Sequence, residues 1–329
     1  MSDVRAFLDA SEAFFGHLAA VSFGALFLAL LFHLVRLVFR VRAWQNILRA
    51  AYPDAGVPFW SAFGAYMGGV GVNAITPARG GDLVKLYLAR HRVQGSSYPT
   101  LGSTLVVETL FDFVVGTVLL LVALQLGLLP GVSHLPALPA FDWSFVVGHP
   151  QIAAILGCMF VAGLILLVHW AAGHVTAFRE KVTRGFAILD DWRAFTARVL
   201  VWQAASWVMR VVAVFWFLEA FHIAATPETV LAVLVVQGLA TTLPFTPGGA
   251  GTQQAVLVFA LAGTAARSAV LSFSVGMQLA TVALNVVVGF AAIAIMLGTV
   301  RWRSHVLAPE EGLTSRARAA VRSRSDSRA

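Results

Sequence analysis

The sequence predicts an all-α polytopic membrane protein. Of its 329 residues, 59% are hydrophobic and 12% are charged, whereas about 25% are charged in an ordinary soluble domain. Six stretches contain no Asp, Glu, Lys or Arg: 13–35, 55–78, 113–141, 143–178, 229–266 and 268–300. A helix of about 20 apolar residues crosses the hydrocarbon core, so these stretches are long enough to enter or span it. The composition excludes a soluble enzyme.

Basic residues are clustered, and loops rich in Lys and Arg stay on the cytoplasmic side of a membrane. Twenty of the 23 Lys and Arg residues fall in four segments: 36–49, 79–92, 179–198 and 301–328. We expect these segments, and so the C-terminus, to be cytoplasmic. The linkers 129–150 and 223–228 contain neither Lys nor Arg and are expected outside.

The first predicted span covers residues 14–35. A signal peptide is the poorer interpretation, because the preceding segment is acidic, the apolar run is long, and Arg36, Arg40 and Arg42 follow it. We therefore expect a retained span, followed by the basic segment 36–49.

The next apolar run, 57–76, lies between two segments that are both expected in the cytoplasm. A single crossing there would place Arg79 and Lys85 on the wrong face. We predict a re-entrant hairpin that enters from the cytoplasm, breaks at Thr76-Pro77-Ala78-Arg79-Gly80-Gly81 and leaves through 82–92. Non-helical backbone at this depth is permitted only inside protein or beside a water-filled cavity.

Three further segments connect this hairpin to the second half of the chain. Spans are predicted over 98–128 and 151–171. Residues 172–197 mix apolar and basic side chains with the spacing of an amphipathic helix on the cytoplasmic leaflet. The following span, 199–222, contains Arg210 in its middle.

The second half repeats the broken helix. Residues 229–245 are expected to start outside, break at Thr246-Pro247-Gly248-Gly249-Ala250-Gly251 and return outward, so that 268–300 delivers the basic tail inside. The two breaks align as TPARGGD and TPGGAGT. Inverted halves that each contain a broken helix are typical of secondary transporters.

We therefore predict a single membrane domain over 1–300 with an inverted-topology repeat of halves 14–128 and 199–300. A basic, disordered tail follows over 301–329. The alternative is eight simple crossings with a chance match between the two motifs.

The breaks suggest an anion site. Proline ends the incoming helix in each hairpin. Asp82 and Thr252 are expected to cap the outgoing helices, whose N-terminal N–H groups then point to the middle of the membrane. Arg79 and Lys85 add positive charge, which predicts a phosphate-bearing headgroup as ligand. Alternatively, Asp82 only caps the helix and pairs with Arg79 or Lys85.

Charged residues also lie inside the spans. Glu108 and Asp112 are four residues apart and so share one helical face. Such residues mark a transport pathway or a buried pair. They either pair with Arg79 or Arg210 or relay protons, and Arg210 is either a counter-ion or a second headgroup contact.

Smaller features have structural interpretations. The four glycines between Gly64 and Gly71 favour close helix packing, and Trp44 and Trp60 are expected at the membrane interface. Asn73 and Gln254 are either ligand contacts or interhelical hydrogen bonds. The full set of candidate substrate-binding residues is Asn73, Thr76, Pro77, Arg79, Gly80, Gly81, Asp82, Lys85, Glu108, Asp112, Arg210, Thr246, Pro247, Gly248, Gly249, Gly251 and Gln254.

Three parts of the chain together resemble the lysylphosphatidylglycerol synthase transmembrane region, or flippase-like, family. They are the run from Asn73 to Leu88, the pair Glu108 and Asp112, and the run from Pro244 to Ala255. The resemblance covers roughly 14–300. It departs at Thr109, where the family commonly has Arg, and at Gln254, where it commonly has Glu.

The resemblance implies a bacterial or archaeal inner-membrane domain that moves lipid between leaflets. In the synthases, aminoacyl transfer belongs to a separate soluble domain, so we expect no aminoacyltransferase activity here.

The sequence thus predicts a lipid translocase for an anionic phospholipid or a polyprenyl phosphate lipid. One alternative is an intramembrane enzyme that acts on lipid-linked substrates through Glu108 and Asp112. Another is a non-transporting partner of a lipid or glycan biosynthesis enzyme. No cofactor, metal site or nucleic-acid partner is expected. The single cysteine, Cys158, lies in an apolar run, and the basic tail suits anionic lipid.

Overall fold

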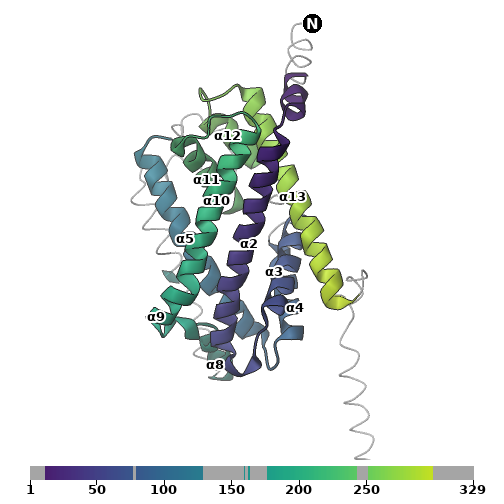
Figure 1. Cartoon of the computed structure of the whole chain (residues 1–329). Coiled ribbons are helices and arrows are strands. Elements are labelled where there is room, and N and C mark those ends of the chain that lie inside the picture. Colours follow the sequence, from purple (N-terminus) through teal and green to yellow (C-terminus); the bar gives the residue numbers. More distant parts are fainter. Residues whose placement is uncertain are drawn as a thin grey trace, which may run out of the picture.

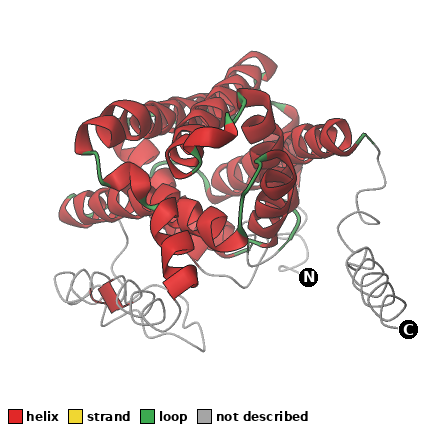
Figure 2. Cartoon of the chain, turned by 90° about the horizontal axis from the view of Figure 1, so that it is seen from below, coloured by secondary structure: helices red, strands yellow, loops and turns green. Residues whose placement is uncertain are grey.

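The structure is a computed structural model that describes residues 12–76, 79–128, 159, 162–163, 176–242 and 251–298. Within these residues the regular elements are helices, apart from one isolated bridge between Ala262 and Ala265. Figures 1 and 2 show the helices packed side by side along one principal direction.

Four of the described helices are long and apolar enough to cross a membrane, so the protein is a multi-pass membrane protein. This confirms the predicted all-α membrane class. The four are α2 (Phe23–Ala51), α5 (Tyr98–Gln125), the continuous helix Trp192–Ala220 and α13 (Arg267–Leu297). The third of them consists of α9 (Trp192–Phe195), the π-turn η4 (Thr196–Leu200) and α10 (Val201–Ala220).

The basic segment 36–49 was wrongly interpreted as a loop. A short helix over 12–19 comes first, and α2 then continues to Ala51. Arg36 and Arg40 therefore lie within α2, at the level of the bundle interior. The reason is that carboxylates on α5 offset the charge of Arg40, so the helix has no need to end before it.

The amphipathic segment was also predicted too long. Its helix, α8 (Thr176–Gly185), is followed by the short helix η3 (Ala187–Leu189). Asp191 then caps the next helix, because its side chain accepts from the backbone N–H groups of Arg193 and Ala194. The long helix that opens the second half therefore begins at Trp192 rather than at residue 199, where the span was predicted to start.

Four shorter helices form two adjacent pairs. Helices α3 (Phe59–Asn73) and α4 (Gly80–Arg92) lie at the end of the bundle where α2 finishes (Figure 1). Helices α11 (Pro227–Thr242) and α12 (Thr252–Ala260) lie at the opposite end (Figure 1). Each pair packs into its own apolar core, around Trp44 and Leu88 at one end and around Leu218 and Leu257 at the other.

Glycines allow α3 to approach its neighbours closely, as the sequence predicted. A Cβ atom on Gly71 would lie 2.7 Å from the Cα atom of Gly289 in α13. A Cβ atom on Gly81 would lie 2.1 Å from the carbonyl oxygen of Gly69. Backbone atoms therefore touch on both sides of α3.

One shift relates the helices of the two halves. The threonines of the two TP motifs, Thr76 and Thr246, are 170 residues apart. Moved by that amount, α2, α3, α4 and α5 each begin and end within two residues of Trp192–Ala220, α11, α12 and α13. One corresponding pair, α2 and α10, packs antiparallel: the backbone N–H of Ser22, just before α2, donates to the carbonyl of Ala220, at the end of α10, at 2.9 Å.

Candidate functional site

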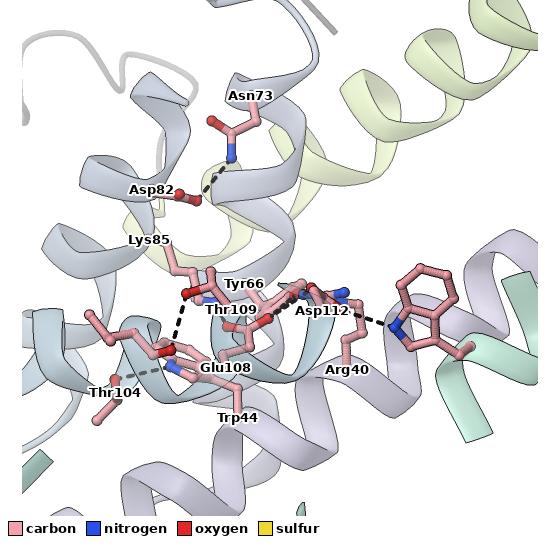
Figure 3. Close-up of polar contacts among 12 residues, drawn as sticks. Arg40, Trp44, Tyr66, Asn73, Asp82, Lys85, Thr104, Glu108, Thr109 and Asp112 are labelled. Carbon is pink, nitrogen blue, oxygen red and sulfur yellow. Dashed lines mark hydrogen bonds and ion pairs between the residues drawn. The ribbon is translucent and has the colours of Figure 1, made fainter. Parts of the chain in front are cut away.

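The centre of the described bundle holds a cluster of charged side chains from α2, α4 and α5, together with Tyr66 of α3 (Figure 3). Arg40 of α2 points at α5, where Nη2 donates to Oε1 of Glu108 at 2.9 Å and to Oδ2 of Asp112 at 2.6 Å. The four-residue spacing on α5 places both carboxylates on the face that Arg40 reaches. Glu108 and Asp112 are thus paired, but with Arg40 and not with the predicted partners Arg79 or Arg210.

Glu108 is enclosed by two further partners. Tyr66 of α3 donates its hydroxyl to Oε1 at 2.6 Å, and Lys85 of α4 donates Nζ to Oε2 at 2.6 Å. The Lys85 ammonium also lies 4.1 Å from the ring centre of Trp44 and 3.9 Å from that of Tyr66. The side chains of Lys85 and Glu108 are only 5% and 4% exposed, and a buried pair of this kind is tolerated when its polar atoms are hydrogen-bonded.

Helix α10 adds a second group of polar side chains. Trp207 donates its indole N–H to Oδ1 of Asp112 at 3.0 Å, and the Arg210 guanidinium lies 4.7 Å from the Trp207 ring centre. Arg210 also donates to Oε1 of Gln237 on α11 at 3.2 Å. Asp112 thus connects Arg40 to the Trp207 indole.

Positive charge exceeds negative charge in this region. Arg36 lies within electrostatic range of Arg40, Arg210 and Asp112. Together with Lys85, the cations number four, against the carboxylates of Glu108 and Asp112 and that of Asp82, which lies within electrostatic range of Lys85. The Nε atoms of Arg36 and Arg210 are buried and have no hydrogen-bond partner. The arrangement can therefore accept an anion.

The tip of the first hairpin forms a separate polar group. Asn73 accepts from the backbone N–H of Gly81 at 2.7 Å and donates to Oδ1 of Asp82 at 2.9 Å (Figure 3). The hydroxyl of Thr76 donates to the carbonyl of Val72 at 2.8 Å. One N–H group at the start of α4 is therefore satisfied by an α3 side chain.

The predicted caps of the outgoing helices were wrong. Helix α4 begins at Gly80, with exposed Arg79 at the N-cap position in a left-handed conformation, φ 57°. Asp82 lies in the first turn and pairs with Asn73 rather than with Arg79 or Lys85. Gly81 allows the close approach of α4 to α3. The N-cap lies three residues before the predicted one.

In the second hairpin, Gly251 rather than Thr252 occupies the N-cap position of α12, with φ 88°. This conformation suits glycine. Gln254 accepts from the Gly251 N–H at 2.6 Å and donates to Gln278 of α13. The remaining candidates of the two breaks lie outside the described residues: Pro77, Thr246, Pro247, Gly248 and Gly249.

The structure thus brings some candidates together and separates others. Lys85, Glu108, Asp112 and Arg210 gather in the central cluster, the hairpin-tip candidates lie apart from them, and Gln254 lies in the other hairpin. The carboxylates pair with Arg40 and Lys85, rather than with Arg79 or Arg210.

Sequence reasoning missed several residues of this region. Arg36 and Arg40 have the same four-residue spacing as Glu108 and Asp112, and that match was the available signal. Trp44 was wrongly assigned to the interface, because it is fully buried beneath Lys85. In the described part of the chain, no three His, Cys, Asp or Glu side chains lie together as a metal site requires.

A family model described as the lysylphosphatidylglycerol synthase TM region matches residues 6–289. No curated protein matches the chain.

Proposed function

The chain belongs to the lysylphosphatidylglycerol synthase TM region family, and on that premise we propose that it is a lipid translocase. Its substrate is a lipid with a phosphate-bearing headgroup, such as an anionic phospholipid or a polyprenyl phosphate lipid. The headgroup passes through the polar centre of the bundle while the acyl or prenyl chains stay in the bilayer.

The observation that carries this proposal is the excess of positive charge inside the bundle. Arginine at membrane depth is costly and normally pairs with an acidic group or lines a pathway. Four central cations exceed the two carboxylates that contact them and the nearby carboxylate of Asp82, which leaves charge for a ligand to neutralise. A phosphate supplies that charge and accepts paired hydrogen bonds from a guanidinium.

The proposal includes two re-entrant hairpins, α3–α4 and α11–α12, that enter from opposite faces of the membrane. Their lengths support this reading: α3 and α4 extend about 22 and 20 Å, whereas the hydrocarbon core is about 30 Å thick. The two pairs also lie at opposite ends of the bundle (Figure 1). An inverted repeat of this kind allows alternating access to a central site.

The proposed orientation places the α3–α4 end in the cytoplasm of a bacterial cell, at the inner membrane. Exposed basic residues support it: Arg90 and Arg92 on α4 and Lys181 and Arg184 on α8. The tail after α13 then also lies inside. Exposed Arg79, at the start of α4, is proposed to receive the headgroup before it reaches the central cations.

Reconstitution into vesicles with headgroup-labelled fluorescent lipids tests the proposal. The wild-type chain is expected to move phosphate-bearing lipid between leaflets, and Arg79→Ala is expected to slow it. Arg193→Ala removes an exposed arginine of α9, which lies on the opposite side of the bundle from α4 in Figure 1, and is the matched control. Equal rates of lipid movement with wild type and Arg79→Ala, or no lipid movement with either, would contradict the proposal.

A further inference from the structure

The packing of α2 against α10 has a register that can be followed along both helices. Ser22 bonds to Ala220, the rings of Phe39 and Trp202 are 5.7 Å apart, and Asn46 donates to the carbonyl of Arg198. Moving 14 residues along α2 from Ser22 reaches Arg36, and the same step back along α10 from Ala220 reaches Ser206. Arg36 therefore lies opposite Ser206.

These two positions also correspond under the 170-residue shift, and so do Arg40 and Arg210. Arg36 thus stands at the centre of the repeat. Arg40 lies about 6 Å from it toward one end of the bundle, and Arg210 a similar distance toward the other. The three arginines form a row along the seam between α2 and α10.

The row is neutralised on one side only. Arg40 contacts both Glu108 and Asp112, but the corresponding positions of the second half hold Gln278 and Val282. Arg210 donates instead to the neutral amide of Gln237. Arg36 forms no hydrogen bond or ion pair with any described residue.

Unpartnered polar atoms concentrate on the same seam. Four described side chains have a buried nitrogen or oxygen without a partner: Arg36, Gln203, Arg210 and Ser274. Three of the four lie on α2 and α10, the two helices of the seam, and Gln203 is seven residues, about two turns, before Arg210 on one face of α10. Native proteins leave few such groups, so a cluster of them indicates a missing ligand.

We propose that Arg36 and Arg210 form a phosphate-binding subsite at the α2–α10 seam, which takes the phosphate ester of a lipid headgroup at the midpoint of the bundle. This rests on the proposed translocase function and names the site at which the lipid is held. Glu108 and Asp112 offset the charge of Arg40, so the phosphate is held beside the two arginines that have no described carboxylate in contact.

Lipid binding to the purified full chain in detergent, followed by native mass spectrometry and thermal unfolding, tests the subsite. Three probes separate the ligand sources: phosphatidylglycerol, diacylglycerol with the same acyl chains, and glycerol 3-phosphate. Phosphatidylglycerol is expected to bind and to raise the unfolding temperature. Glycerol 3-phosphate acting as strongly would overturn the lipid assignment, and diacylglycerol acting as strongly would overturn the phosphate assignment.

Arg36→Met and Arg210→Met are each expected to weaken phosphatidylglycerol binding about 10- to 100-fold, the effect of losing a charge-assisted hydrogen bond. Without lipid, both variants should unfold at or above the wild-type temperature, because each removes a cation that lacks a carboxylate partner. Arg36→Lys and Arg210→Lys should retain part of the binding. Arg193→Met serves as the matched control and should bind like wild type.

Unchanged binding in both Met variants would overturn the subsite, and so would a lower unfolding temperature in the absence of lipid, which marks a structural arginine. The vesicle assay is read separately. Wild-type lipid movement with unaffected Met variants would reject the subsite alone. Absence of movement by wild type would reject the translocase function itself.

Discussion

Glu108 accepts hydrogen bonds from three helices through one carboxylate. Oε1 receives Arg40 of α2 and Tyr66 of α3, and Oε2 receives Lys85 of α4. Each partner is itself buried or nearly so, which means that water cannot replace a lost bond. Glu108 therefore links α5 to α2, α3 and α4, the other helices of the first half.

Glu108→Gln is expected to destabilise the protein by about 3–5 kcal/mol, because it leaves Lys85 buried without a counter-ion. Thermal unfolding in detergent measures the change. Glu180→Gln alters an exposed carboxylate on α8 and is the control. Adding Lys85→Met to Glu108→Gln should restore part of the lost stability. If Glu108→Gln alone unfolds at the same temperature as Glu180→Gln, Glu108 is not the counter-ion on which this stability depends.

At this scale the sequence predicted that Glu108 and Asp112 share a face and either pair or relay protons. The partners it named, Arg79 or Arg210, were wrong, since Arg40 is 68 residues before Glu108 and only the tertiary packing of α2 against α5 brings them together. Arg40 was also wrongly assigned to a loop. The positive-inside rule counts Lys and Arg along the sequence, and it does not include a carboxylate on another helix that can stabilise an arginine within a span.

Helix α3 is closely enclosed, with α4 on one side and α13 on the other. Its contacts depend on backbone atoms that meet where side chains are absent. Such contacts tolerate little added volume. The position of Tyr66 and Asn73, both on α3, depends on this fit.

Gly71→Ala is expected to destabilise the protein by about 1–3 kcal/mol, because the new methyl group lies 2.7 Å from the Gly289 backbone. Gly116→Ala on α5 is the matched control, since nothing lies within 4 Å of its added carbon. The control should be neutral or stabilising by up to about 1 kcal/mol, as expected for removing glycine from a helix. Thermal unfolding of both variants checks the difference, and equal unfolding temperatures would rule out tight packing at Gly71.

The existence of the long helices could be predicted, because each contains an uncharged run long enough to enter or span the hydrocarbon core. Their ends were less predictable. Helix α2 extends to Ala51 past its arginines, and the helix after α8 begins at Trp192 because Asp191 caps it. Caps of this kind compete with other polar residues nearby, so the sequence alone placed them several residues away.

Across the whole molecule, two halves with matching helices carry different charges. Arg40 and Arg210 correspond, but only the first half supplies carboxylates on the last helix of the repeat. The TP motifs supply the 170-residue shift that aligns the two sets of helices. The difference, that Arg40 has carboxylate partners and Arg210 has none among the described residues, follows only once the correspondence is extended to every helix.

Cysteine labelling of a Cys158→Ser background tests the arrangement of the halves. Asp54→Cys and Gln94→Cys flank the α3–α4 pair, and Ala224→Cys and Thr264→Cys flank α11–α12; all four positions are exposed. An impermeant maleimide added to intact cells is expected to label the second pair of cysteines and not the first. The reason is that two short helices enter and leave by the same face, whereas the long helices cross.

Thr76→Cys separates a re-entrant hairpin from two full crossings, which would place the flanking positions on the same side as well. Full crossings would put residue 76 in an external loop, where it would react as fast as Ala224→Cys. A hairpin that turns inside the bilayer keeps residue 76 near mid-depth, so its labelling should be much slower. Rapid labelling of Thr76→Cys, or external labelling of Gln94→Cys, would contradict the inverted repeat. The placement of Arg36 at the centre of that repeat would then lose its basis.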